Sequence, residues 1–232
     1  SGSQSSYSTH ELAGSDWLDQ TPNHWNVKRL KYSIAQTKGG VWGGEPEDSD
    51  EAIWCVRIAD FDRKSLRVTT DTKTFRSVPA NERIGRLLRP GMLIVEKSGG
   101  GDKTPVGAVV LFDHPGLAVS SNFTNVIRLK DGMYPGFWAY VHQALYVSGR
   151  TWKSIKQTSG IQNLDFEKYL NELAPFPPLD EQISISDQLD QELSEIAKLQ
   201  AALDSLCDLL TERRAALISA AVTGKIDVRG RN

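Results

Sequence analysis

The last quarter of the chain carries its most regular pattern of apolar positions. Leucine or isoleucine recurs every seven residues, which is the period of a coiled-coil seam. The positions are Leu189, Ile196, Leu203, Leu210 and Leu217. Neither proline nor glycine occurs from residue 179 to residue 223. The pattern therefore predicts one long α-helix over residues 179–223, followed by a short tail at 224–232.

The residues at both ends fit a helix with these bounds. Pro177 and Pro178 cannot continue a helix, whereas Asp180 is a favourable N-cap residue. Gly224 stands where a left-handed helix cap is expected. At 1.5 Å per residue, about 43 residues make a rod of roughly 64 Å. Such a rod is much longer than the mean globular helix of about 12 residues.

The apolar stripe of this helix is expected to pair with another helix, because a domain of about 160 residues is narrower than the rod. The candidate pairing residues are Leu189, Leu193, Ile196, Leu199, Leu203, Leu206, Leu210 and Leu217. Gln200, Cys207, Arg213 and Arg214 interrupt the flanks of the seam. The alternative is that the stripe packs against the chain's own domain.

Residues 16–178 show shorter apolar runs, separated by polar and glycine-rich segments. Strands are predicted at 53–58, 67–70, 92–95, 106–112 and 125–129. Pro135 opens a predicted helix, because Phe137, Val141 and Leu145 follow at helical spacing. The pattern predicts an α+β fold, in which a mixed-strand domain with irregular loops over 16–178 precedes the long coiled-coil-type helix.

Composition and length place the chain among ordinary globular proteins. Its 232 residues are 39% hydrophobic and 24% charged. No apolar run approaches the roughly 18 residues that cross a bilayer, so no membrane partner is expected. Residues 1–15 are interpreted as a disordered leader that opens with a Ser-Gly-Ser cloning remnant. Cys55 and Cys207 match no metal or redox spacing, which favours reduced thiols in the cytoplasm.

The charge is unevenly distributed along the chain, although the net charge is only −2. Residues 55–160 hold 16 Lys and Arg against 8 Asp and Glu, a net of +8. Residues 176–232 hold 6 against 10, a net of −4. A positive middle is suited to a polyanion and a negative end to a protein partner, although ordinary soluble proteins also show such imbalances.

The motifs of common enzymes are missing from the sequence. It contains no GxSxG, no HExxH, no Walker loop and no GxGxxG after a predicted strand. The four histidines, His10, His24, His114 and His142, have no partner at ligand spacing. We therefore expect no catalytic residue, no metal site and no cofactor in this chain. A diverged nuclease or methyltransferase stays open as a minor alternative.

Two polar, basic loops, at 97–104 and 153–163, are instead suited to binding DNA. Lysine neutralises phosphate, glycine permits close approach of the backbone, and Gln or Asn hydrogen-bonds adenine in two places. Several arginines elsewhere in the domain are candidates for contacts with phosphate or guanine. The candidate DNA-binding residues are Arg57, Arg63, Lys97, Ser98, Gly99, Lys103, Thr104, Arg150, Lys153, Lys156, Gln157, Thr158, Gln162 and Asn163, with Arg76, Arg83 and Arg86 as further possibilities.

Several segments resemble one half of the specificity subunit of type I restriction–modification systems. The most specific are 160–164 (GIQNL), 176–182 (FPPLDEQ) and 212–228 (ERRAALISAAVTGKIDV). Residues 17–30, 88–94, 97–99 and 121–123 are similar to further landmarks of its target recognition domain. The resemblance covers about residues 16–228.

The resemblance implies sequence-specific recognition of double-stranded DNA without catalysis. In that family, two recognition domains each read half of a bipartite target, and two long helices pair antiparallel. The helices dock DNA adenine methyltransferase subunits, which use S-adenosylmethionine, and a restriction and translocase subunit that uses ATP and Mg²⁺ joins them.

This chain carries one such half, since the 176–182 and 212–228 segments occur once. It is either a fragment or a half-length form that makes a homodimer through the long helix, with an interrupted palindrome as its target. A protein-interaction adaptor that acts through the helix, with no role in DNA binding, is the alternative function.

Overall fold

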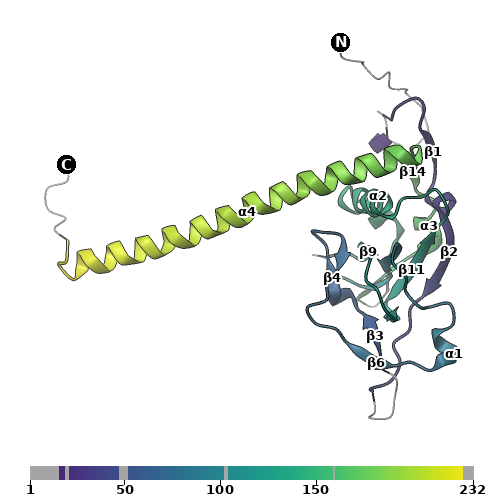
Figure 1. Ribbon diagram of the computed structural model, residues 1–232, viewed down its shortest axis with the longest axis horizontal. Coiled ribbons are helices and arrows are strands. Elements are labelled where there is room, and N and C mark those ends of the chain that lie inside the picture. Colours follow the sequence, from purple (N-terminus) through teal and green to yellow (C-terminus); the bar gives the residue numbers. More distant parts are fainter. Residues whose placement is uncertain (1–15, 19–20, 47–51, 102–103, 159, 227–232) are drawn as a thin grey trace. The chain divides into compact units, whose positions relative to one another are not determined.

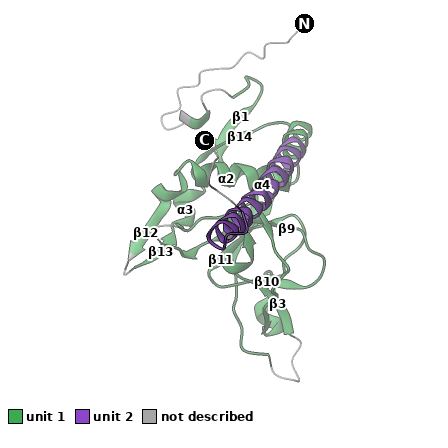
Figure 2. Cartoon of the chain, turned by 90° about the vertical axis from the view of Figure 1, so that its left-hand side faces the viewer, with its two compact units in different colours: residues 1–186 green, residues 187–232 purple. Residues whose placement is uncertain are grey.

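The computed structural model describes residues 16–18, 21–46, 52–101, 104–158 and 160–226. The predicted leader at 1–15 lies outside the described residues, as does most of the tail at 224–232. The chain divides into two compact units, residues 1–186 and 187–232 (Figure 2).

The first unit contains short strands and helices, and the second contains most of one long helix (Figure 1). The strands are β1 Asn26–Arg29, β2 Ile34–Gly39, β3 Ala52–Val56, β4 Phe61–Asp62, β5 Arg67–Val68, β6 Phe75–Ser77, β7 Met92–Glu96, β8 Ser98–Gly99, β9 Val109–Phe112, β10 Ala118–Ser120, β11 Thr124–Leu129, β12 Ile155–Thr158, β13 Ile161–Leu164 and β14 Leu173–Phe176. The α-helices are α1 Ala80–Arg83, α2 Pro135–Val147, α3 Phe166–Tyr169 and α4 Leu179–Val222. Four 3-10 helices are η1 Asp16–Leu18, η2 Leu30–Ser33, η3 Ile58–Asp60 and η4 Thr151–Ser154.

The described strands form four sheets. The largest has the order β2-β11-β7-β9-β5-β4 and is antiparallel except between β5 and β9. A second sheet has the order β10-β3-β6, with β10 parallel to β3. The remaining two are β12-β13-β8 and the pair β1-β14. The predicted α+β class is confirmed.

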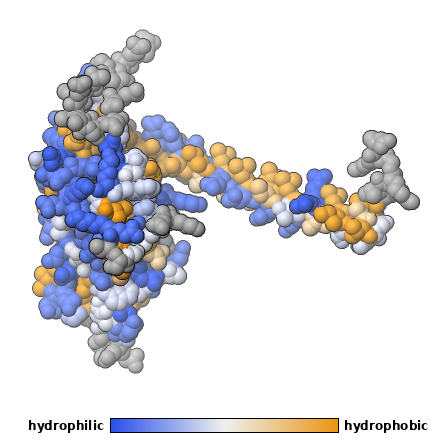
Figure 3. Space-filling model, turned by 180° about the vertical axis from the view of Figure 1, so that it is seen from behind, coloured by the Kyte–Doolittle hydropathy of each residue, from blue (hydrophilic) through white to orange (hydrophobic). Residues whose placement is uncertain are grey.

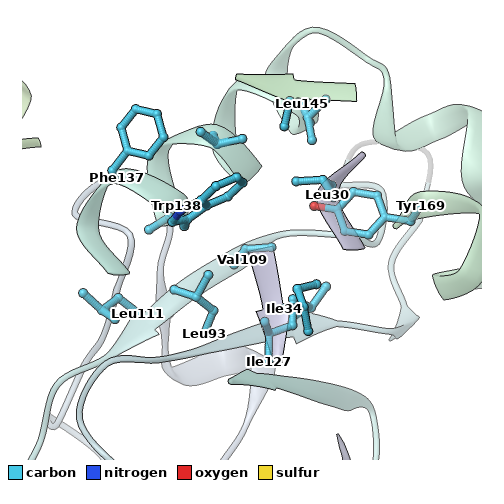
Figure 4. Packing of buried hydrophobic residues seen from close by; sticks show 14 of the residues in the cluster. Leu30, Ile34, Leu93, Val109, Leu111, Ile127, Phe137, Trp138, Leu145 and Tyr169 are labelled. Carbon is cyan, nitrogen blue, oxygen red and sulfur yellow. The ribbon is translucent and has the colours of Figure 1, made fainter. Parts of the chain in front are cut away.

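The core lies on both faces of the six-stranded sheet, because successive side chains of a strand point to opposite faces. On one face, Leu93, Ile127 and Leu111 pack with residues of α2 such as Trp138 and Leu145 (Figure 4). On the other face, side chains next to these along the strands meet the β10-β3-β6 sheet. They are Ile94, Val110, Phe112 and Val126, which pack against Trp54, Val56 and Ala118.

The first two turns of α4 are fixed within the first unit. The buried amide of Gln182 accepts a hydrogen bond from the Tyr134 backbone N–H at 2.9 Å and donates one to the Pro177 carbonyl at 2.9 Å. Glu181 accepts one from the Trp25 indole N–H at 2.8 Å. Because these groups belong to segments that flank β1 and α2, the start of α4 is set by the core of the domain.

The second unit is a helix with an uncovered apolar stripe. Within the described residues, the side chains from Leu193 to Leu217 that follow the heptad pattern are between 41% and 66% exposed. Figure 3 shows these apolar side chains in orange along the helix. Gly224, with a φ of +71°, follows the last turn. The predicted long helix is confirmed, with its end one residue earlier than expected. None of the described helices combines the length and the apolar character needed to span a bilayer.

Two of the expected local structures are wrong. The loop at 153–163 is largely the hairpin β12–β13, which turns at Gly160 with a φ of +84°. Its polar sequence hid the strands, because backbone pairing with β8 holds them together with only Ile155 and Leu164 of the hairpin packed on the core. The strand expected at 106–112 begins at Val109, because Gly107 has a φ of +105°, which an extended strand does not adopt.

Candidate nucleic-acid interface

Loops from both central sheets meet at one edge of the domain. β2, β3, β7 and β10 end there and β11 begins there, as follows from their parallel and antiparallel pairings. Backbone hydrogen bonds join the segments that follow the strands. The Ser121 N–H donates to the Val56 carbonyl at 2.9 Å, and the Lys97 N–H donates to the Phe123 carbonyl at 2.8 Å. We call residues 39–42, 57–59, 97–100 and 121–123 the loop edge.

Gly40 makes this convergence possible. A Cβ at this position would lie 2.0 Å from the Ser121 carbonyl oxygen and 2.4 Å from that of Ser120. Both obstacles are backbone atoms, so only glycine fits. The backbone of the segment after β2 therefore crosses directly over the segment after β10, and the Val41 N–H bonds the Ser120 carbonyl at 2.8 Å.

A cavity of about 300 Å³ opens within the loop edge. Its lining residues are Trp42, Arg57, Ile58, Ala59, Ser121, Asn122 and Phe123. Phe123 is 48% exposed, yet its backbone is held because its carbonyl accepts hydrogen bonds from the N–H groups of Lys97 and Ser98. An exposed aromatic side chain on a fixed backbone, beside polar and cationic groups, is suited to contact with nucleobases.

The small sheet β12-β13-β8 places three of the predicted residues side by side. Lys156 is opposite Asn163, and Asn163 is opposite Ser98, so the three share one face. The Ser98 hydroxyl donates to Asn163 Oδ1 at 2.7 Å. We call Ser98, Asn163 and Lys156 the polar row. The amide N–H groups of Asn163 and the charge of Lys156 give this row donors for bases and for phosphates.

Gln162 lies on the opposite face of the same sheet. Its side chain is buried, and its Oε1 accepts a hydrogen bond from the Val106 backbone N–H at 3.2 Å. The side-chain oxygen of Gln162 thus serves as acceptor for a backbone N–H that has no strand partner. This N–H lies just before Gly107, whose positive φ interrupts the extended backbone ahead of β9. Gln162 therefore holds the hairpin to the domain.

The two lysines nearest these groups have different surroundings. Lys156 is 71% exposed and contacts Asp165 at 2.7 Å. The hydrogen bonds from the Lys156 ammonium and the Lys168 backbone lower the pKa of Asp165. Lys97 is partly buried, with its Nζ beside Gly39 of β2. Lys97 therefore places its charge at the loop edge, and Lys156 places its charge in the polar row.

Four of the predicted arginines contact carboxylates, and one of them is Arg76, which binds Glu45. Arg57 binds Asp60 at 3.0 Å, Arg63 binds Glu96 at 2.8 Å, and Arg150 lies 4.0 Å from Glu172. Arg63 also donates to the Tyr146 hydroxyl at 3.0 Å. Burial raises the pKa of Glu96, while the charge of Arg63 opposes that shift. The structure thus places these guanidinium groups in ion pairs of the domain.

The other predicted residues are spread around the hairpin and the β8 turn. Thr104, Lys153 and Gln157 are exposed, and Gly99 has a φ of +120°. Lys103 and the side chain of Thr158 lie outside the described residues. Trp42 and Asn122, which line the cavity, are not among the DNA-binding residues predicted from the sequence. The only signal for Trp42 was its position among glycines, which indicated a surface loop.

The described residues include two free cysteines and bring no three His, Cys, Asp or Glu side chains into a metal-binding group. Cys55 is buried on β3 beneath the loop edge, and burial raises the pKa of its thiol to about 12. Cys207 is exposed on α4.

No protein-family model matches the sequence. The chain is 25% identical over 163 residues to the type I restriction enzyme EcoKI specificity subunit of Escherichia coli (strain K12), across 70% of this chain and 35% of that protein. The chain therefore spans about a third of the length of this curated relative.

Two solved structures share the fold. A chain from work on complex assembly and conformational transition of the type I R-M system aligns with a TM-score of 0.61 and 20% identity, over 87% of this chain and 46% of that one. The HsdS subunit from Thermoanaerobacter tengcongensis aligns with a TM-score of 0.50 and 21% identity, over 79% and 40%. The α+β domain followed by a long helix is thus matched in fold, and the chain is similar to type I restriction–modification specificity subunits over less than half of their length.

Proposed function

We propose that this chain is a DNA-reading, non-catalytic half of a type I restriction–modification specificity subunit. The observation that carries the proposal is the similarity to a specificity subunit over 70% of the chain. The exposed lysines, the polar row and the exposed aromatic side chains there supply the groups that duplex recognition needs.

Within this proposal, the predicted residues divide into two roles. Lys97 and Lys156, with Lys153 nearby, neutralise phosphates. Asn163 and Ser98 of the polar row bond base edges, and Gln157, Thr158 and Thr104 add polar groups around them. Arg57, Arg63 and Arg150 act through the ion pairs that support these loops.

The partners follow from the same proposal. DNA adenine methyltransferase subunits dock on the long helix and supply S-adenosylmethionine chemistry, and a restriction and translocase subunit supplies ATP and Mg²⁺ chemistry. The chain itself holds no cofactor. The exposed stripe of α4 pairs antiparallel with a second copy, and the homodimer then reads an interrupted palindrome.

Selection from a random duplex library, with the methyltransferase subunits present at physiological salt, tests the proposal. We expect enrichment of a motif with two specified parts and an unspecified spacer. Failure to enrich any interrupted motif would favour an adaptor that acts only through its helix. The salt dependence of the complex separates the two, because DNA binding weakens steeply with salt and an apolar seam does not.

Two substitutions distinguish the proposed roles. Lys97→Gln is expected to weaken binding to every duplex equally and to reduce the salt slope by about 0.9. Asn163→Ala is expected to leave the slope unchanged and to lose about 1–3 kcal/mol of discrimination at one position of the motif. Fluorescence anisotropy on target and substituted duplexes measures both effects. The same outcome for the two variants would contradict this division.

A further inference from the structure

A second polar surface lies at the outer flank of the six-stranded sheet. β2 is the outermost strand, and its register with β11 sets Lys38 opposite Val126 and Gln36 opposite Arg128. Within each strand the two residues are two positions apart, so their side chains point to the same side. All four side chains therefore share one face of the sheet. Gly85, Arg86 and Leu87, which follow α1, face them across a shallow groove. Figure 1 shows β2, β11 and α1 on the same flank.

This surface, the β2–β11 groove, carries positive charge alone. Its lining residues are Gln36, Thr37, Lys38, Gly85, Arg86, Leu87, Met92, Val126 and Arg128, with three cations and no acid. Lys38 and Arg128 are exposed, and within the described residues neither side chain has a hydrogen bond or an ion pair. This differs from Arg57, Arg63 and Arg150, which contact carboxylates.

Arg86 is held in place without being neutralised. Its Nε donates to the Gly39 carbonyl at 3.2 Å, and a terminal nitrogen donates to the Glu82 carbonyl at 2.8 Å. Both acceptors are neutral backbone groups, so the full charge of the guanidinium remains directed at the groove. Fixing the side chain in advance lowers the entropy cost of binding an anion. Gln36 and Thr37 add hydrogen-bonding groups beside it.

The groove is continuous with the loop edge. It ends at Lys38, and the next residue, Gly39, is bonded by Arg86 and lies beside the Lys97 ammonium. Arg128 and Lys38 therefore form a line of cations that leads toward the loop edge, and Lys97 lies beyond its end on the opposite face of the sheet. A negatively charged polymer that contacts the loop edge would meet this line, whereas a small anion would use only one part of it.

We propose that the β2–β11 groove binds the sugar–phosphate backbone of duplex DNA, with Lys38, Arg86 and Arg128 on phosphates. The inference deepens the proposed function and rests on it. These contacts carry no base information, so they set the position of the duplex while the loop edge and the polar row read it.

The test uses the full chain assembled with its methyltransferase subunits and a labelled random-sequence duplex. The double variant Lys38→Gln/Arg128→Gln removes two phosphate contacts and leaves Arg86, whose bonds support the fold, in place. The slope of log affinity against log salt concentration is expected to be shallower by about 1.8 in the variant. Between 50 and 200 mM salt, wild type would then lose about 12-fold more affinity than the variant. The loss at a given salt is equal on target and random duplexes.

The double variant Lys64→Gln/Lys225→Gln is the matched control. It removes the same net charge, from the turn beside the opposite edge of the sheet and from an exposed residue after the end of α4. Thermal unfolding midpoints verify that both variants fold. If the groove variant follows the control, or loses affinity only on the target duplex, the proposal is wrong.

Three further outcomes are separable. If the groove variant fails to assemble with the methyltransferase subunits in the absence of DNA, by size-exclusion chromatography, the groove binds an acidic protein surface and the proposal is overturned. If wild type binds random duplex through the groove but selects no motif, the proposed function fails while the groove assignment stands. If wild type binds no DNA, both fail.

Discussion

At the scale of single residues, the environment of each cation distinguishes supporting from available charges. Arg63 lies between the buried Glu96 and the Tyr146 hydroxyl, so its charge is used inside the domain. Lys38 and Arg128 face solvent with no acidic neighbour in the groove. A charge paired with a buried carboxylate contributes little to a polyanion, because its attraction is offset by that carboxylate, whereas an exposed pair such as Lys156 and Asp165 is weak and its lysine can exchange the carboxylate for a phosphate.

We expect Arg63→Gln to destabilise the fold by about 3 kcal/mol at pH 7, because it leaves a buried carboxylate uncompensated. Burial already raises the pKa of Glu96 above its ordinary value of 4.5. A raised carboxyl pKa favours the fold below the unfolded pKa, and that advantage is lost as the pH rises. Without the charge of Arg63 the pKa of Glu96 rises further, so the variant loses more stability than wild type as the pH rises. The difference in unfolding free energy between the two therefore becomes smaller on acidification. Urea unfolding at pH 7 and pH 5 measures it.

Arg67→Gln is the control for this substitution. Arg67 contacts Asp113 at 2.8 Å, but both side chains are more than a third exposed. An exposed pair contributes about 1 kcal/mol or less. Equal deficits for the two variants, or a deficit of Arg63→Gln that does not depend on pH, would contradict the role assigned to Arg63.

At the scale of elements, the contact between α2 and the first turns of α4 joins the helix to the domain. Gly136 lies at the start of α2, where a Cβ would be 2.4 Å from the Ser186 hydroxyl oxygen. Ser186 is buried, and its hydroxyl has no hydrogen-bond partner within the described residues. The close approach of these two small residues acts together with the Gln182 hydrogen bond to Tyr134 in bringing the two helices together.

Gly136→Ala is therefore expected to destabilise the domain by about 1–3 kcal/mol through overpacking. Adding Ser186→Ala removes the oxygen in the way and restores part of the loss, because the Ser186 Cβ would be 3.5 Å from the new methyl group while Tyr134 Cε1 would still lie 3.0 Å from it. Chemical denaturation of the two single variants and the double variant gives the coupling. Gly44→Ala, where a Cβ meets open space, is the control and should not destabilise. Additive effects would contradict the assigned contact.

At the scale of the whole molecule, the apolar stripe of α4 leaves a large surface in solvent. The helix obeys a heptad pattern from Leu189 to Leu217, and most of these side chains are more than 40% exposed. Single exposed leucines are common in soluble proteins, but a continuous row of them marks an interaction surface. The pattern favours pairing with another helix through knobs-into-holes contacts.

We expect Leu203→Glu to abolish self-association of the chain, because it places a charge at the centre of the seam. Sedimentation equilibrium measures the mass, and circular dichroism verifies the helix. Ser205→Glu, two residues further along and thus on the far side of the helix, should leave association intact. A wild-type chain that is monomeric at high concentration without partner subunits would contradict the homodimer.

Much of the fold could be predicted from the sequence. The heptad row and the flanking Pro178 and Gly224 predicted α4 within one residue at its end, and Pro135 marked the start of α2. Apolar strands such as β7 were also found. The hairpin β12–β13 was missed, because its residues are polar and their pairing with β8 is set by a segment more than fifty residues away.

The candidate site was predictable only in part. Lys97, Ser98, Lys156 and Asn163 were proposed from their residue types, and the structure brings the last three into one row. The roles of Arg63 and Gln162 could not be foreseen, since their partners Glu96 and Val106 are distant in sequence. Lys38 and Arg128 carry no local signal, because each is a single charged residue on an ordinary strand.

The sequence by itself determined the long helix, the strand-forming runs and the excess of positive charge in the middle, because these depend on neighbours along the chain. Tertiary structure alone decided which cations are neutralised, which loops meet at one edge and which face of β2 and β11 stays uncovered. Those outcomes depend on strand pairing between distant segments, where a shift of one residue would turn every side chain to the other face of the sheet.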